Sequence, residues 1–99
     1  MAEETIFKEE TLNKIKKPKM YKVLIHNDDY TTMEFVIEVI TKVFKKSVVE
    51  ATKIMFDVHK KGRGIVGIYS YDIAATKVAQ VENMAKERQY PLRASFEEV

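Results

Sequence analysis

The fold depends on one short stretch, Asn27-Asp28-Asp29-Tyr30-Thr31-Thr32-Met33, which separates a strand-like run from the first clear helical pattern. Amide, carboxylate and hydroxyl side chains are crowded together here, and such side chains are typical of turns and helix caps. The same groups could also converge on a small cation, either a metal ion or an ammonium group. The residues alone therefore leave two interpretations of this stretch, a binding site and a simple turn.

The segments on either side of this stretch predict a strand and a helix. Residues 20–26 alternate, with Tyr21, Val23 and Ile25 on one side of an expected strand. Thr31 and Glu34 have the spacing of a capping box, so a helix is expected to begin at Thr31 or Thr32. Its apolar face comprises Met33, Val36, Ile37, Ile40, Val43 and Phe44.

The rest of the chain predicts two more helices and two more strands. A second capping box, Ser47 with Glu50, begins the next helix, which glycines at 62 and 64 end. A short β-branched run over 65–69 reads as a strand. Ser70 or Asp72 then caps a third helix, whose inner stripe is Ala74, Val78, Val81 and Ala85.

Pro91 forbids further helix, and alternation over residues 92–96 predicts a last strand. The order is strand, helix, helix, strand, helix, strand. We expect an α+β fold with three helices on a small, three-stranded, mainly antiparallel sheet.

Length and composition limit the possible classes of protein. The chain has 99 residues, 45% hydrophobic content and a net charge of +2, which fits one globular domain and gives no argument for nucleic acid or a membrane as partner. It has no cysteine. Residues 1–19 are rich in Lys and Glu and predict a flexible, disordered tail, with the core domain over 20–99. The acidic start is unlike a signal peptide, so a cytoplasmic protein is expected.

Three residues have the chemistry to hold a protonated α-amino group. This group has three donors and carries substantial positive charge at neutral pH. Asn27, Asp28 and His59 supply an amide oxygen, a carboxylate and an imidazole nitrogen as acceptors. On spacing alone, however, His59 is more typical of a packing histidine on an apolar helix face than of a ligand.

An apolar pocket beside these groups could hold the side chain attached to the amine. The two helices offer Met33 with Val36, and Met55 with Val58, each pair at i, i+3. Methionine is adaptable and contacts aromatic rings favourably, so an aromatic or leucine side chain would fit. By spacing alone, these four residues are core residues.

Two rival functions belong to other classes. A metal-dependent hydrolase could use His26, Asp28, Asp29 and His59, but no HExxH or similarly spaced ligand set exists, and no nucleophile motif is present. An RNA-binding module could use Lys60-Lys61-Gly62-Arg63-Gly64, but this cluster lacks adjacent stacking aromatics and reads as a helix end. No catalytic residue is therefore expected.

The run MYKVLIHNDDYTTMEFV, residues 20–36, resembles the signature of ClpS, the bacterial adaptor family that delivers N-degron substrates to the ClpA–ClpP protease. The resemblance extends without gaps from residue 20 to about residue 97. Further matches are Ala51-Thr52, Met55, Val58-His59, Gly62, Gly67, Thr76-Lys77-Val78 and Pro91-Leu92.

The resemblance implies roles for residues of the opening stretch. Asn27, Asp28 and His59 match the family residues that hold the substrate's α-amino group, with the Asp acting partly through water. In the family, the adjoining pocket takes N-terminal Leu, Phe, Tyr or Trp, and the residue at Met33 is a gate against β-branched side chains. The residues that match the pocket lining are Asp29, Thr31, Met33, Val36, Met55, Val58 and Leu92.

The resemblance also implies partners. Asp72 and Lys77 match positions that dock to the N-terminal domain of the hexameric ClpA unfoldase, and the leader corresponds to a flexible tail that takes part in substrate transfer. The resemblance further implies a monomer with no metal or cofactor that catalyses no reaction, and the partner is the protein that uses ATP. The chain departs from the family at Thr32, where many members have Pro, at His26, which is often apolar, and at Ala75, where many have Glu.

Overall fold

The chain forms one three-stranded sheet with helices packed against it. The computed structural model describes residues 18–99, so most of the predicted tail over 1–19 lies outside the described residues. The elements are β1 (Tyr21–His26), α2 (Met33–Phe44), α3 (Val48–Lys61), β2 (Arg63–Tyr69), α4 (Tyr71–Glu87) and β3 (Arg93–Glu98). This order and the α+β class are those predicted from the sequence, and the prediction is confirmed.

Strand β1 is the centre of the sheet, in the order β2-β1-β3, and both neighbours run antiparallel to it. The register with β2 shifts where Val23 pairs with Gly67 and Leu24 pairs with Ile65. Val66 is therefore an extra residue in β2, and this bulge lets its side chain remain 2% exposed in the core.

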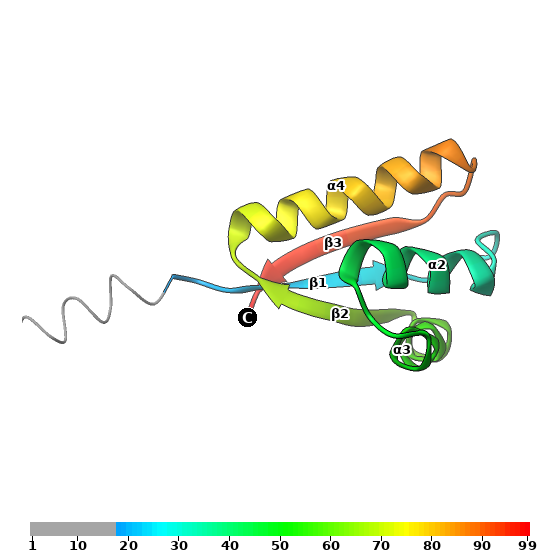
Figure 1. Cartoon of the computed structure of the whole chain (residues 1–99), viewed down its shortest axis with the longest axis horizontal. Coiled ribbons are helices and arrows are strands. Elements are labelled where there is room, and N and C mark those ends of the chain that lie inside the picture. Colours follow the sequence, from blue (N-terminus) through cyan, green and yellow to red (C-terminus); the bar gives the residue numbers. More distant parts are fainter. Residues whose placement is uncertain (1–17) are drawn as a thin grey trace, which may run out of the picture.

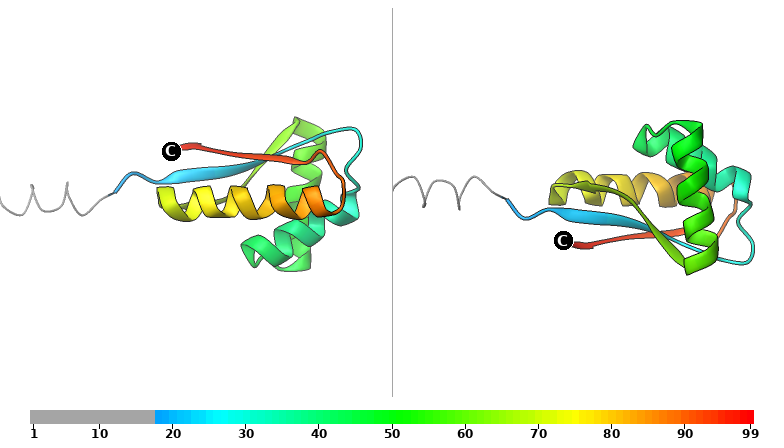
Figure 2. Two further views of the ribbon diagram at one scale, coloured as in Figure 1. Left: turned by 90° about the horizontal axis from the view of Figure 1, so that it is seen from above. Right: turned by 90° about the horizontal axis from the view of Figure 1, so that it is seen from below.

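The helices lie mainly on one face of the sheet. Helix α4 packs along β3 and β1, and α2 lies beside it on the same face (Figures 1 and 2). Helix α3 contacts β2 and α2 and is seen end-on in Figure 1, so it crosses near the end of the sheet where β1 finishes. The largest fully buried side chains are Ile25, Ile40, Val23, Val39 and Val81.

The opposite face of the sheet carries polar pairs across its strands. Lys22 forms an ion pair with Glu97 at 3.3 Å, and His26 Nε2 lies 2.6 Å from Ser95 Oγ. This one-sided burial explains the alternation in β1, although Leu24 on the polar side is only 4% exposed.

Several predicted boundaries need correction. Of the two predicted starts of α2, Thr32 is the cap, because its hydroxyl accepts from the Phe35 N–H at 3.2 Å. The capping-box pairing of Thr31 with Glu34 is wrong. Ser47 caps α3 as predicted. Ser70 occupies the cap position of α4 without a side-chain hydrogen bond.

The last two strands also differ from their predicted ranges. Strand β2 begins at Arg63 rather than at residue 65, and β3 covers Arg93–Glu98 rather than 92–96. Both extensions pair with β1, whose His26 faces Arg63 and whose Tyr21 faces Glu98. Their polar side chains conceal the strand ends in the sequence, because backbone pairing needs no apolar side chain.

Candidate functional site

A cavity of about 220 Å³ lies where β1 ends, between the loop that follows it, the start of α2 and the last turns of α3. Every residue that lines it was expected in the binding site from the sequence. The lining residues are Asn27, Asp28, Asp29, Thr31, Met33, Val36, Met55, Val58 and His59.

The Asp28 carboxylate organises the loop. Its Oδ1 accepts from the Tyr30 N–H at 2.8 Å and from the Thr31 N–H at 2.6 Å, while its Oδ2 accepts from the Thr31 hydroxyl at 2.7 Å. The turn interpretation is therefore correct for this residue, since a carboxylate that bonds the backbone two residues ahead is a standard turn device. The same turn also forms one wall of the cavity, so the two interpretations do not exclude each other.

These hydrogen bonds also set the charge of Asp28. Partial burial raises the pKa of its carboxyl group, but the bonds from the Thr31 hydroxyl, the Thr31 N–H and the Tyr30 N–H act in the opposite direction and leave the pKa below its ordinary value. The carboxylate is consequently ionised at neutral pH and places a negative charge in the cavity wall.

A backbone hydrogen bond joins the loop to α3. The Asn27 N–H donates to the Gly62 carbonyl at 2.8 Å, and the Gly62 N–H donates to the Val58 carbonyl at 3.0 Å. Gly62 has a φ of 88°, which a side-chain-bearing residue rarely adopts. A Cβ on Gly64 would lie 2.9 Å from Val58 Cγ2. These two glycines allow a tight turn from α3 into β2. The tight turn and the hydrogen bond from Asn27 keep the last turn of α3, which contains His59, close to the loop.

His59 and Asn27 have side chains available for a ligand. Both residues are exposed, and within residues 18–99 neither side chain forms a hydrogen bond with another residue. The alternative of a buried packing histidine at position 59 is wrong, because the helix turns this residue toward the cavity mouth rather than into the core.

The apolar wall belongs to both the cavity and the core. Val36, Met55 and Val58 are 6%, 5% and 2% exposed and belong to the buried cluster, whereas Met33 is 44% exposed. The core interpretation was thus correct for three of the four residues, and their outer surfaces also line the cavity. Met33 instead stands at the opening.

Leu92 is not among the residues that line this cavity. It is buried, at 3% exposure, immediately before β3, and it borders a different hollow together with Tyr90, Pro91 and Arg93. The place in the pocket lining that the resemblance implies for Leu92 therefore differs from its place in the structure.

The metal and RNA interpretations find no support in the described part of the chain. Among residues 18–99, no group of three or more His, Asp or Glu side chains is arranged to hold a metal ion. His26 faces Ser95 on the polar side of the sheet. Lys61, in the basic cluster of the RNA interpretation, is the last residue of α3, and its Nζ forms an ion pair with Asp57 Oδ1 at 3.8 Å. No helix in this range has the length and apolar character needed to cross a bilayer.

The two predicted docking residues differ in their surroundings. Asp72 is exposed in the first turn of α4, near the start of β1 and far along the sheet from the cavity. Lys77 is half-buried, because its Nζ donates to the Val43 carbonyl at 2.6 Å and lies 5.9 Å from the centre of the Tyr69 ring. Lys77 therefore also links α4 to the end of α2.

Comparison with known proteins identifies the family. The family model described as ATP-dependent Clp protease adaptor protein ClpS matches residues 16–95. The chain belongs to the ClpS family. The ClpS adapter of Acetivibrio thermocellus is 59% identical over 97 residues, which are 98% of each chain. That of Clostridium acetobutylicum is 60% identical over 87 residues, 88% of this chain and 86% of its own.

A solved ClpS structure shares the fold. The structure of Agrobacterium tumefaciens ClpS2 bound to L-phenylalaninamide is 37% identical and has a TM-score of 0.82, covering 84% of this chain and all of that one. The resemblance stated from residues 20–36 to the ClpS family is confirmed.

Proposed function

We propose that this ClpS adaptor binds proteins that begin with Leu, Phe, Tyr or Trp and carry a free α-amino group, and that it delivers them to a ClpA-type unfoldase. The observation that carries the proposal is the cavity itself, which combines a buried apolar wall with acceptor groups at one side. The adaptor acts in the cytoplasm as a monomer, without a cofactor or metal, and catalyses no reaction.

The amine would be recognised by Asn27, His59 and Asp28. Asn27 and His59 offer an amide oxygen and an imidazole nitrogen whose hydrogen-bonding capacity is not used inside the described chain. Asp28 uses three acceptor positions within its own loop, out of about four on a carboxylate. It therefore contributes its negative charge and one further acceptor position, reached directly or through water.

The first side chain would occupy the space between Met33, Val36, Met55 and Val58. An apolar cavity of roughly 150 Å³ is large enough to hold benzene, so a cavity of about 220 Å³ has room for a phenyl or isobutyl group. L-phenylalaninamide, which the similar Agrobacterium protein binds, has a free α-amine and a phenyl ring. The apolar wall of the cavity would select the phenyl ring, and the acceptor groups at its other side would select the free amine.

Delivery would use the other end of the molecule. Asp72 and Lys77 on α4 are proposed to contact the N-terminal domain of the unfoldase, with the exposed Asp72 as the more direct contact. Residues 20–99 would form the complete binding core, and the segment before it would take part in transferring the substrate.

Fluorescence anisotropy with two labelled peptides tests the binding step. One peptide begins with Phe, and the other is identical but N-acetylated. Acetylation removes the charge and leaves acceptors unsatisfied, so we expect at least about tenfold weaker binding. His59→Ala should weaken binding of the free peptide, whereas Val49→Ala, on the first turn of the same helix, should not. Equal binding of the two peptides would refute the proposal.

A further inference from the structure

Three large side chains with apolar surface that the core does not bury either line the cavity or directly neighbour a lining residue in the sequence. Tyr30, Met33 and Phe56 are 79%, 44% and 46% exposed. We infer that these residues, here named the rim, bind the second residue of the substrate and favour a large apolar side chain there. The inference rests on the proposed function and adds a second specificity position to it.

The rim residues come from three different segments, each of which contributes lining residues to the cavity. Tyr30 lies in the loop between Asp29 and Thr31, which both line the cavity. Met33 is itself a lining residue at the start of α2. Phe56 follows the lining residue Met55 on α3.

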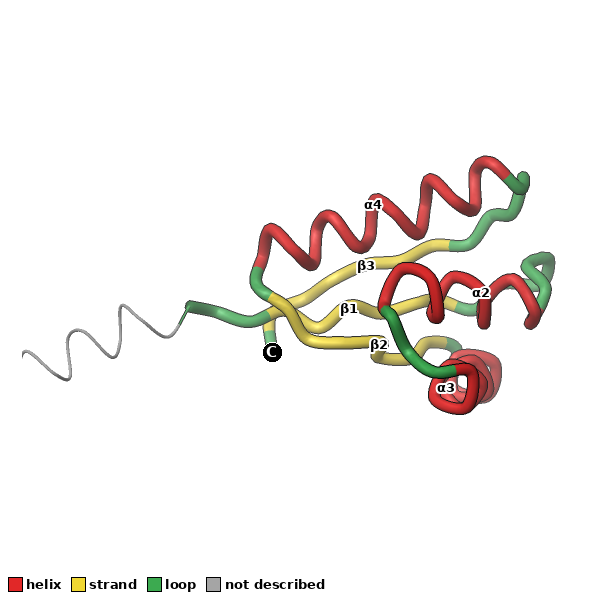
Figure 3. The backbone as a smooth tube through the Cα atoms, in the orientation of Figure 1, coloured by secondary structure: helices red, strands yellow, loops and turns green. Residues whose placement is uncertain are grey.

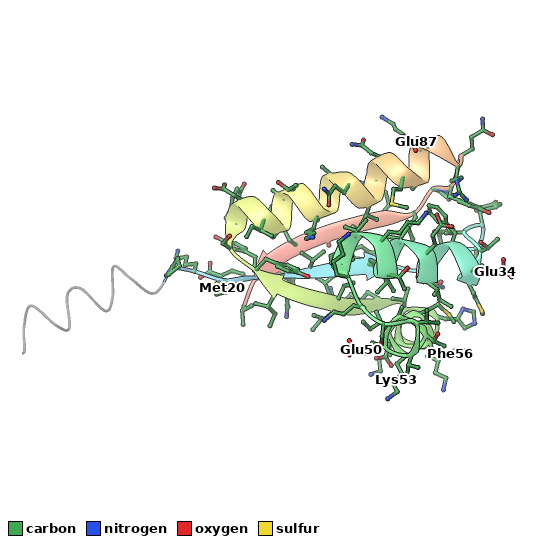
Figure 4. The ribbon with its side chains drawn as sticks, viewed as in Figure 1. Met20, Glu34, Glu50, Lys53, Phe56 and Glu87 are labelled. Carbon is green, nitrogen blue, oxygen red and sulfur yellow. The ribbon has the colours of Figure 1, made fainter. Side chains whose placement is uncertain are left out.

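Phe56 is also close to the proposed amine site. It precedes His59 by three positions, and residues three apart are neighbours on a helix surface. Figure 4 shows Phe56 on the outward side of α3, at the same end of the molecule as Glu34 in the first turn of α2. Phe56 therefore lies outside the cavity lining but neighbours His59, which is a lining residue, on the surface of α3.

Chain continuity places the second residue at this rim. If the amine is held by Asn27 and His59 and the first side chain fills the cavity, the next Cα lies only 3.8 Å from the first. The second residue is then at the opening, within reach of side chains as long as Tyr, Met and Phe. It would cover apolar surface that is exposed to water in the unbound protein, and burial of that surface stabilises the complex.

The rim differs from the other exposed apolar residues of α3. Val48 and Val49 are 65% and 66% exposed, but they lie on the first turn of the helix, about two turns before Phe56. Unlike Tyr30 and Phe56, neither valine is next to a lining residue in the sequence. Val49→Ala is therefore a matched control for Phe56→Ala, since both variants shorten an exposed apolar side chain on one helix.

The test measures binding of three peptides that differ only at their first two residues: Phe-Leu, Phe-Ser and N-acetylated Phe-Leu. Leu and Ser are both uncharged, so the nearby charges of Asp29, Glu34 and Lys60 do not enter the comparison. For the wild-type protein we expect Phe-Leu to bind about fivefold more tightly than Phe-Ser. Phe56→Ala should reduce this ratio to about one to two, and Val49→Ala should leave it unchanged.

Tyr30→Ala provides a second variant, and thermal unfolding followed by circular dichroism checks that each variant is folded. The inference would be overturned if the wild type bound Phe-Leu and Phe-Ser equally well. It would also be overturned if Phe56→Ala and Tyr30→Ala both kept the full preference for Phe-Leu. If the acetylated peptide still binds far more weakly in that case, the proposed function stands and only the rim assignment fails. If the acetylated peptide binds as tightly as the free one, both fail together.

Discussion

Met33 is the residue at which the size of the first side chain would be controlled. It lines the cavity and is 44% exposed, so it lies at the opening rather than in the packed wall. We predict that Met33→Ala widens the opening and admits peptides that begin with Val or Ile. Binding of Val- and Phe-initiated peptides to both proteins measures this. Unchanged discrimination against Val would remove the gate role.

Asp28 should make stability depend on pH in the acidic range. Its pKa is lowered in the folded protein, so its contribution is fully present above its unfolded value of about 4 and is lost as the pH falls through the folded value. We predict that the difference in unfolding free energy between wild type and Asp28→Asn shrinks as the pH falls from 6 to about 2.

Urea denaturation at several pH values measures this difference. Asp29→Asn is the control, because the Asp29 carboxylate takes no part in the three loop hydrogen bonds. A difference that is the same at every pH would show that the charge of Asp28 does not stabilise the loop.

Residue chemistry predicted this site well and residue partners less well. Asn27, Asp28 and His59 were chosen for their acceptors, and all three line one cavity. The roles of Thr31 and Thr32 were not separable, because both are adjacent hydroxyl residues before a helix. In the structure the Thr31 hydroxyl donates to the Asp28 carboxylate, whereas the Thr32 hydroxyl caps α2. Leu92 was assigned to the pocket lining by resemblance alone. It lies far along the chain from the other lining residues, so no local sequence pattern could test that assignment.

Among the elements, α4 carries two predicted docking residues with different structural duties. Lys77 donates to the last turn of α2, whereas the Asp72 side chain is exposed. We predict that Lys77→Met lowers the free energy of unfolding by about 1 kcal/mol and also weakens unfoldase binding. Asp72→Asn should weaken unfoldase binding alone. Urea denaturation, combined with binding to the isolated ClpA N-terminal domain, separates the two effects.

The outcome that would contradict this assignment is a Lys77→Met variant of wild-type stability. In that case the hydrogen bond to Val43 would contribute nothing, and the lysine would act at the surface only. Loss of stability in Asp72→Asn would similarly show that the exposed carboxylate supports the start of α4, where its charge favours the helix dipole.

Helices and strands were predictable because each has a strong sequence pattern of its own. The ends of the strands were less predictable because backbone pairing with a neighbouring strand sets them. The apolar stripe of α2 and the Ser47 cap of α3 are local signals. The extension of β3 to Glu98 depends on pairing with Tyr21, which lies far away in sequence and leaves no local trace.

The whole molecule separates the cavity from the proposed docking face. The cavity follows the end of β1, and Asp72 lies near its beginning, because β2 returns antiparallel and ends opposite Tyr21. A strand of six residues spans about 20 Å. We predict that saturating ClpA N-terminal domain changes peptide affinity by less than about twofold, because the two proposed sites share no residue and binding at one leaves the contacts at the other unchanged.

Anisotropy titrations of a Phe-initiated peptide, with and without the domain, measure this coupling. The same result should hold in reverse, since coupling of binding free energies is reciprocal. A tenfold change in either direction would mean that the domain reaches the cavity or shifts α3.

The central position of β1 has a mechanical consequence. Residues 18–20 continue the line of β1 (Figures 1 and 3), and the other end of the strand passes directly into Asn27 and Asp28. A pulling force applied at Pro18 would therefore act along the strand and shear both flanking ladders at once, rather than unzip them one bond at a time. Many backbone hydrogen bonds would resist together, and the first displacement past that resistance would draw the binding loop away from α3. Tension at one end of this strand is thus transmitted to the loop at the other end.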